Sequence, residues 1–180
     1  MNGTTRILIA GFGGQGALFA GKFLAYSGLT EEKMLSWLPS YGPEMRGGTA
    51  NCGVIISDVP VGSPIVSEPD VLIAMNRPSF EKFEPAVSAG GLIVMDSTLI
   101  DCASSRTDIT VIPVPATAMA AELKLEGLSN MILAGRMIRE TGVVKPENAR
   151  TALEKFVPAK KAHLIDANLR ALEAGYGYQG

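Results

Sequence analysis

Cysteine, histidine and aromatic side chains are scarce in this 180-residue chain. It has two cysteines, Cys52 and Cys102, with no CxxC pair, and a single histidine, His163. Iron–sulfur clusters and structural zinc ions need more thiolate or imidazole ligands than these, so we expect no metal site in this chain. So small a number of cysteines is typical of a protein of the reducing cytoplasm.

Clustered positive charge is also lacking. Sixteen basic and eighteen acidic residues give a formal net charge of −2, and no basic cluster is longer than Lys160-Lys161. Aromatic residues make up 6% of the chain and are scattered along it. Since nucleic-acid binders carry basic patches, often beside aromatic platforms, we expect no nucleic-acid partner.

No apolar run is long enough to cross a membrane. Residues 7–21 carry no charge, but a spanning helix takes about 20 apolar residues. Glycines interrupt this stretch and would weaken the apolar helix of a secretory signal, so no signal is expected either. The sequence therefore predicts a cytoplasmic chain without a membrane partner.

Apolar residues and glycine are what the chain has in quantity. Apolar residues make up 47% and charged residues 19%, which is typical of a folded domain with a sizeable core. The length suits one domain, and we expect residues 1–180 to form it.

Strand-like and helix-like segments alternate along the chain. Short apolar runs predict strands at 6–10, 34–38, 51–56, 71–75, 92–96 and 109–114. A further strand at 61–66 is expected to return antiparallel after a turn, and Pro113 places the last strand at an edge. Helices are expected at 17–27, at 77–87 and, from the spacing of apolar residues, beyond 130, with a loose tail at 175–180. The sequence thus predicts an α/β fold: a three-layer Rossmann-like domain with a mostly parallel, mixed sheet and a C-terminal helical segment.

A glycine-rich loop joins the first strand to the first helix. Residues 11–16 read Gly-Phe-Gly-Gly-Gln-Gly, the GxGxxG pattern of dinucleotide-binding turns. Glycine permits a tight turn, and we expect Gly13 to adopt positive φ or to lie against neighbouring backbone. The following helix would offer free N–H groups to an anion. Gln15 is expected either to complete the turn or to hydrogen-bond across an interface.

Several occupants of this loop stay open at this point. An NAD site would also carry an acidic residue about 20 positions on, at the end of the second strand. Glu31 and Glu32 precede that strand instead, which disfavours NAD. The alternatives are a tight turn without a ligand, a loop that faces a partner chain, and a site for a different phosphate.

Three segments, taken in order, carry a resemblance to a known family. They are Gly-Phe-Gly-Gly-Gln-Gly at 11–16, Ser-Tyr-Gly-Pro-Glu-Met-Arg-Gly-Gly at 40–48 and Asn-Met-Ile-Leu-Ala-Gly at 130–135. Together they resemble the gamma subunit, or the equivalent fused domain, of the 2-oxoacid:ferredoxin oxidoreductases. The likeness covers essentially the whole chain, and the second segment is its most specific part.

The resemblance implies a reaction divided among several chains. In this family a 2-oxoacid is decarboxylated on thiamine diphosphate, which is held with Mg. Electrons then pass through iron–sulfur clusters to ferredoxin, and the acyl group goes to coenzyme A. This chain has no Gly-Asp-Gly thiamine motif and no cluster cysteines. Those cofactors are therefore implied on thiamine-binding and ferredoxin-like partner chains, and this chain alone is expected to be inactive.

The resemblance also implies where the chain acts. In fused relatives the matching domain lies against the thiamine site and shapes the coenzyme A entrance, so both glycine-containing loops are expected to face that cleft. No catalytic residue is expected among them; they are cofactor-binding or subunit-interface candidates. These candidates are Gly11, Gly13, Gly14, Gln15, Gly16, Ser40, Tyr41, Gly42, Glu44, Arg46, Gly47 and Gly48.

Arg46 is the strongest single candidate. Two glycines follow it and remove steric cover, and a guanidinium can pair with phosphate or carboxylate through two hydrogen bonds. An ion pair with Glu44 is the alternative. Tyr41 either anchors the loop or donates to a ligand. Elsewhere, Asn130 is expected to cap the helix that follows it, and Cys52 to be buried and inert.

Two other functions fit parts of the pattern. One is a stand-alone Rossmann-type nucleotide-binding protein, and the other is a non-catalytic interaction module that forms a homodimer in isolation. Within the resembled family, the form of the 40–48 segment favours the 2-oxoglutarate branch. Pyruvate, branched-chain oxoacid and indolepyruvate are the other branches.

Overall fold

The computed structural model describes residues 3–40 and 49–180 and contains one six-stranded sheet. Its strands are β1 (Thr4–Phe12), β2 (Met34–Ser40), β3 (Thr49–Ser57), β4 (Val71–Ala74), β5 (Leu92–Asp96) and β6 (Thr110–Val114). They lie in the order β2-β3-β1-β4-β5-β6. The strands β1, β4, β5 and β6 run parallel to one another, whereas β3 is antiparallel to both β1 and β2. The predicted mixed sheet is confirmed, with β6 at an edge as expected.

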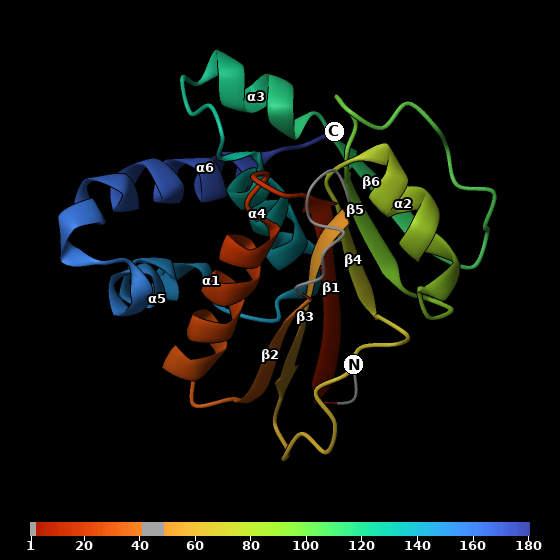
Figure 1. Cartoon of the computed structure of the whole chain (residues 1–180), viewed down its shortest axis with the longest axis horizontal. Coiled ribbons are helices and arrows are strands. Elements are labelled where there is room, and N and C mark those ends of the chain that lie inside the picture. Colours follow the sequence, from red (N-terminus) through yellow and green to blue (C-terminus); the bar gives the residue numbers. More distant parts are fainter. Residues whose placement is uncertain (1–2, 41–48) are drawn as a thin grey trace.

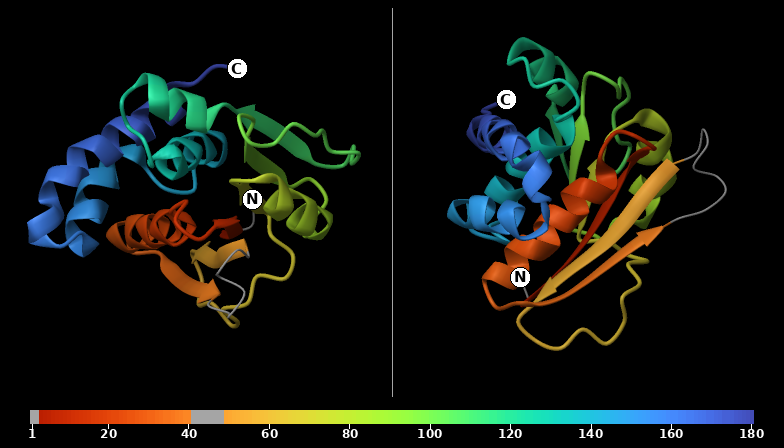
Figure 2. Two further views of the ribbon diagram at one scale, coloured as in Figure 1. Left: turned by 45° about the horizontal axis from the view of Figure 1, so that its top comes forward. Right: turned by 60° about the vertical axis from the view of Figure 1, so that its left-hand side comes forward.

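Helices cover both faces of the sheet, which makes three layers (Figures 1 and 2). The α-helices are α1 (Ala17–Thr30), α2 (Arg77–Phe83), α3 (Ala116–Glu122), α4 (Ser129–Thr141), α5 (Ala149–Phe156) and α6 (Ile165–Gly177). Short 3₁₀ turns are η2 (Glu84–Ala86), η3 (Pro146–Asn148) and η4 (Ala159–Leu164). Figure 2 shows α1, α4, α5 and α6 on one side of the sheet and α2 on the other. The C-terminal helical segment is therefore confirmed.

The two faces of the sheet bury different clusters because side chains alternate along a strand. Along β1, Ile7 and Ile9 point into the larger of two hydrophobic clusters, which lies between the sheet and the helices α1, α4, α5 and α6. Leu8 and Ala10 point into the smaller cluster, which contains Phe80 of α2. In the part of the chain that the structure describes, no helix is long and apolar enough to cross a membrane.

Two glycines let α4 and α6 cross at very short range. A Cβ added to Gly175 would lie 1.8 Å from the backbone oxygen of Ile132, and one added to Gly135 would lie 2.1 Å from the oxygen of Leu172. Neither glycine has an unusual backbone conformation that would require it. The absence of side chains at this crossing is what allows the two helices to pack.

The predicted strand at 61–66 is wrong. That segment forms no strand, because β3 is already hydrogen-bonded on both sides by β1 and β2 and has no free edge. Pro60 and Pro64 also lack the N–H groups that a ladder requires. The segment instead lies over the sheet, where Val66 packs against the smaller cluster. The antiparallel partners of β3 are thus β1 and β2.

The C-terminal tail is also more ordered than expected. The helix α6 continues to Gly177, and the carbonyl of Tyr178 accepts hydrogen bonds from the guanidinium groups of Arg136 and Arg139. The Arg136 guanidinium lies 5.9 Å from the centre of the Tyr178 ring. Two arginine side chains of α4 therefore fix the C-terminal tail, which the sequence had predicted to be loose because of its glycines.

Candidate functional site

The glycine loop lies at the carboxyl ends of the parallel strands. It leaves β1 after Phe12 and enters α1 at Ala17. Figure 1 shows this turn at the end of the sheet from which α3 leaves, with the N-terminus at the opposite end. Open α/β sheets place their ligand sites at this edge.

Gln15 holds the loop in shape through its own side chain. Its carboxamide oxygen accepts from the backbone N–H of Phe12 at 2.6 Å and from the Asn76 side chain at 2.8 Å. Its amide nitrogen donates to the carbonyl of Met75 at 3.2 Å. Gln15 therefore completes the turn and ties β1 to the end of β4, which is the first of the two roles expected for it.

Positive φ occurs at Gly14 and Gly16 but not at Gly13, so the first of the two alternatives expected for Gly13 is wrong. The φ values of Gly14 and Gly16 are +95° and +83°, in the region that L side chains rarely adopt. A Cβ on Gly14 would meet no atom within 4 Å, so the backbone of the loop is open on that side. At Gly11, by contrast, a Cβ would lie 3.0 Å from both Gln15 and Met75. Gly11 permits close packing of the loop against Gln15 and Met75, whereas Gly14 leaves free space on its side of the loop.

The N-terminus of α1 is suited to an anion. Gly16 occupies the N-cap position and provides no side-chain hydrogen bond, and the first turn contains no acidic residue. Free N–H groups and the helix dipole at such an end favour negative charge. The arrangement can therefore hold a phosphate or carboxylate group without any charged side chain of the loop.

The pattern of strands argues against a dinucleotide site of Rossmann type. In that fold the acidic residue that binds ribose ends the strand next to β1, parallel to it. Here β2 is not adjacent to β1 and pairs antiparallel with β3. Glu31 accepts from the backbone N–H of Lys145 and the side chain of Asn148, so it fixes the loop after α4. Among residues 3–40 and 49–180, the acids that precede β2 are therefore not placed to bind a ribose at the glycine loop.

The strand register brings the end of β2 to the edge where the glycine loop lies. Ser40 is exposed and pairs with Asn51 of β3, which in turn pairs with Ala10 of β1. Ser40 and the start of the glycine loop thus share one end of the sheet. The remaining candidates of this segment lie outside the described residues; they are Tyr41, Gly42, Glu44, Arg46, Gly47 and Gly48.

Two buried polar residues at this edge had not been expected from the sequence. Asn76 follows β4, and its side-chain oxygen caps α2 by accepting from the N–H of Ser79 at 2.9 Å. Asp96 ends β5, and its carboxylate accepts from the N–H and hydroxyl of Thr117 and from the N–H of Thr98. A polar residue directly after an apolar run was the signal that could have found both. Asp96 fixes the start of α3 beside the site.

Asn130 does not cap α4, contrary to expectation. The helix begins at Ser129, so Asn130 lies within its first turn. The side chain instead donates from Nδ2 to the carbonyl of Gly16 at 3.1 Å. A Cβ on Gly16 would lie 2.7 Å from that nitrogen. The third segment of the resemblance is thus connected to the first, because Asn130 contacts the last glycine of the loop.

Cys52 has no role in chemistry at this site. It is buried against α1, and burial raises the pKa of its thiol to about 12. A thiol with such a pKa is not a nucleophile at neutral pH. Within residues 3–40 and 49–180, no group of three or more Cys, His, Asp and Glu side chains is placed to hold a metal ion.

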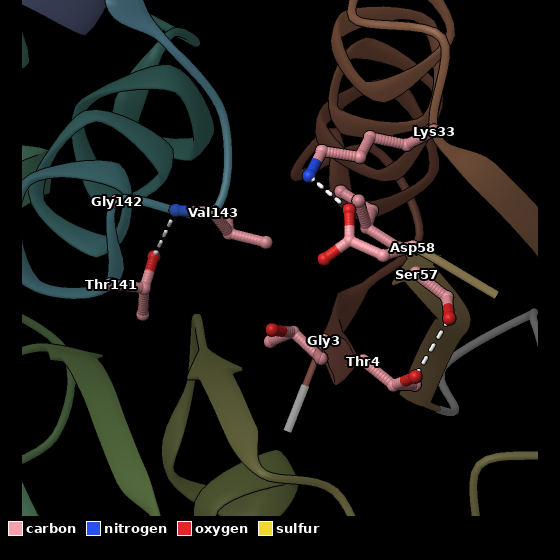
Figure 3. Close-up of a pocket in the computed structure, with 10 residues that line it drawn as sticks. Gly3, Thr4, Lys33, Ser57, Asp58, Thr141, Gly142 and Val143 are labelled. Carbon is pink, nitrogen blue, oxygen red and sulfur yellow. Dashed lines mark hydrogen bonds and ion pairs between the residues drawn. The ribbon is translucent and has the colours of Figure 1, made fainter. Parts of the chain in front are cut away.

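A polar hollow at the opposite edge of the sheet is a weaker candidate. Figure 3 shows it between the start of β1, the end of β3 and the turn after α4. Lys33 and Asp58 point toward each other there and form an ion pair, and the Thr4 and Ser57 hydroxyls are 2.7 Å apart. Its polar groups pair with one another, and it lies at the amino end of β1, away from the glycine loop.

Comparison with known proteins identifies the family of the chain. A family model described as pyruvate ferredoxin/flavodoxin oxidoreductase matches residues 6–178. The chain belongs to this family. The resemblance to its gamma-type subunits, first drawn from the three segments, is confirmed, and the α/β fold is that of a solved member.

Two relatives and one structure show how members of this family are built. The ketoisovalerate oxidoreductase subunit VorA of Methanothermobacter thermautotrophicus is 44% identical over 94% of this chain and 35% of its own length. The 2-oxoglutarate synthase subunit KorC of Methanocaldococcus jannaschii is 33% identical over 94% of this chain and 91% of its own. The keto/oxoacid ferredoxin oxidoreductase gamma subunit from Geobacter sulfurreducens has a TM-score of 0.83 at 29% identity, over 97% of this chain and 95% of that one. The chain thus spans about a third of the ketoisovalerate relative and nearly all of the other two.

Proposed function

We propose that this chain is the gamma subunit of a multi-subunit 2-oxoacid:ferredoxin oxidoreductase, that residues 1–180 form its single gamma-type domain, and that it is inactive alone. The names of the relatives support this proposal, since each is a subunit of an oxidoreductase or synthase of this kind. Thiamine diphosphate, Mg and the iron–sulfur clusters belong to thiamine-binding and ferredoxin-like partner chains, where they supply the decarboxylation and the electron transfer.

The observation that carries the proposed role is the open N-terminus of α1. It has no side-chain cap and no acidic first turn, and Gly14 leaves empty space beside it. Coenzyme A brings phosphate groups, and an exposed helix N-terminus binds such groups. We propose that the glycine loop and the 40–48 segment form one wall of the cleft near thiamine diphosphate and coenzyme A.

The relatives divide over the oxoacid. Higher identity supports a branched-chain oxoacid such as ketoisovalerate, whereas the match over nearly full length supports 2-oxoglutarate. We retain 2-oxoglutarate as the proposed substrate, from the form of the 40–48 segment. Turnover of the reconstituted complex with 2-oxoglutarate, ketoisovalerate, pyruvate and indolepyruvate distinguishes the four.

Arg46→Ala in the assembled complex tests the coenzyme A contact. A hydrogen bond to a charged group contributes about 1.5–3 kcal/mol, so the apparent affinity for coenzyme A should fall roughly 10- to 150-fold. Arg46→Lys should recover only part of this, because an ammonium group cannot make two parallel hydrogen bonds. Acyl-CoA formation against coenzyme A concentration is the first measurement. Oxoacid-dependent cluster bleaching without coenzyme A is the second and should barely change.

The outcome of these two assays separates the roles of Arg46. A fall in both would mean that Arg46 holds the subunits or the thiamine site in place. No change in either, in an intact complex, would show that Arg46 is only a surface ion pair and that the proposed contact is wrong.

A matched pair of glycines tests the loop itself. Gly14 and Gly90 both have positive φ, and a Cβ at either would meet no atom within 4 Å. Alanine at either position should therefore cost similar backbone strain, about 1–2 kcal/mol. Only Gly14→Ala puts a methyl group into the space beside the α1 N-terminus, so only this variant should raise the KM for coenzyme A. Equal KM values for the two variants would remove the loop from the binding site.

A further inference from the structure

The last peptide unit of the glycine loop is held from α4. The side-chain nitrogen Nδ2 of Asn130 donates to the carbonyl of Gly16 at 3.1 Å, although the two residues lie 114 positions apart in the sequence. The backbone N–H of Ala20 donates to the same carbonyl at 3.0 Å. Two donors, one from α1 and one from α4, therefore fix the direction of the Gly16 carbonyl.

Fixing this carbonyl also fixes the N–H group of Ala17. The two groups belong to one planar trans peptide unit, in which they point in opposite directions. Ala17 is the first residue of α1, and the first N–H groups of a helix have no partner within it. A hydrogen bond accepted by the carbonyl also polarises the peptide unit, which makes its N–H a stronger donor. Asn130 thus sets the direction of the first N–H of α1 and strengthens it as a donor.

Gly16 depends on such a contact because it has no side chain to restrain its own backbone. It occupies the N-cap position of α1 with a φ of +83° and makes no side-chain cap hydrogen bond. A Cβ added to it would lie 2.7 Å from Nδ2 and 2.9 Å from Cγ of Asn130, so the carboxamide lies directly against the Gly16 backbone. Glycine has more backbone freedom than any other residue. Asn130 therefore supplies the restraint that a side chain at position 16 would otherwise give.

We propose that Asn130 is a positioning residue for the anionic ligand of the glycine loop, because it directs the N–H of Ala17 at the phosphate group that binds there. This inference rests on the proposed coenzyme A contact and adds a residue of α4 to it. Asn130 is 3% exposed and its amide nitrogen is bonded to Gly16, so it acts through the peptide unit and not by touching the ligand. An N–H group that is oriented before the ligand arrives does not have to be ordered on binding, which favours affinity.

Asn168 provides a matched control for Asn130. Each of the two asparagines is 3% exposed, and the side-chain oxygen of each is buried without a hydrogen-bond partner among the described residues. The amide nitrogen of Asn168 also donates to a backbone carbonyl, that of Leu164, at 2.7 Å. This acceptor is only four positions away, whereas Asn130 reaches another element. The two residues therefore differ in whether their hydrogen bond reaches the glycine loop.

Steady-state kinetics of the assembled oxidoreductase complex with Asn130→Leu and with Asn168→Leu test the proposal. Leucine is close to asparagine in size and has no N–H donor in its side chain. An ordinary hydrogen bond changes an affinity by about two- to tenfold. Asn130→Leu should therefore raise the KM for coenzyme A by this factor, with a smaller change in kcat. Asn168→Leu should leave both constants at their wild-type values.

Amide exchange of the isolated chain, followed by NMR, tests the contact without coenzyme A. The N–H of Ala20 is bonded to the Gly16 carbonyl, so Asn130→Leu should speed its exchange with solvent about two- to tenfold. Asn168→Leu should leave this rate unchanged. Thermal unfolding verifies that both variants are folded. If Asn130→Leu is not, Asn130→Ala removes the same donor with a smaller side chain, and the same results are expected of it.

The outcomes separate this inference from the proposed function. If Gly14→Ala raises the KM for coenzyme A but the two asparagine variants have equal KM values, the coenzyme A contact stands and this inference is wrong. Equal exchange rates of the Ala20 amide in the two asparagine variants would also overturn it, because the Gly16 carbonyl would then not depend on Asn130. If neither Gly14→Ala nor Asn130→Leu raises the KM, the coenzyme A contact itself fails, and this inference fails with it.

Discussion

Replacing Gly175 by alanine is expected to destabilise the fold at the crossing of α4 and α6. The new methyl carbon would lie 1.8 Å from the oxygen of Ile132, 2.6 Å from its carbonyl carbon and 2.9 Å from its Cα. All three atoms are backbone, so a rotamer change cannot relieve the clash. The helices have to separate, and the core residues between them lose contact.

The size of the effect follows from two opposing terms. Overpacking of a well-packed interior costs typically about 1–3 kcal/mol and occasionally more, and a backbone clash lies at the upper end. Alanine in a helix interior recovers about 1 kcal/mol relative to glycine. A net loss of about 2 kcal/mol lowers the Tm of a chain of this length by roughly 4–8 °C.

Gly177→Ala provides the matched control. Gly177 lies in the same final turn of α6, and a Cβ there would meet nothing within 4 Å. Alanine at that position should leave the Tm unchanged or raise it slightly. Thermal and urea unfolding of both variants are the measurements. If Gly175→Ala is as stable as Gly177→Ala, the close crossing of the helices does not exist and the reasoning is refuted.

Two more predictions concern residues near the glycine loop. Burial raises the pKa of the Cys52 thiol to about 12. Iodoacetamide at pH 8 should therefore alkylate the half-exposed Cys102 of the native chain and spare Cys52. Equal labelling of the two cysteines, measured by peptide mass, would contradict the burial of Cys52. Gln15→Leu removes three hydrogen bonds and should lower the free energy of unfolding by about 1–3 kcal/mol. Gln179→Leu in the exposed tail is the control and should leave this free energy unchanged. Equal midpoints of urea unfolding for the two variants would mean that the Gln15 side chain does not hold the loop.

Much of the architecture could be predicted because it depends on local patterns. Short apolar runs such as Val71–Ala74 form strands buried on both faces, and their alternation with helical segments gives an α/β fold. Pro113 indicated an edge strand, and β6 is one. The strand at 61–66 was mispredicted because its apolar residues suit a strand, whereas the free edge that it needs depends on the pairing of β1, β2 and β3.

The candidate site also has features that the sequence predicts and features that only the tertiary structure shows. Sequence alone determined that a glycine loop joins β1 to α1 and that this chain lacks the cysteines of an iron–sulfur cluster. Only the tertiary structure decided which glycines have positive φ, that Gln15 ties the loop to Met75 and Asn76, and that Asn130 reaches Gly16. Residues more than a hundred positions apart meet there because helix packing brings them together. No local pattern encodes such a contact, since its energy comes from the fit of whole elements against one another.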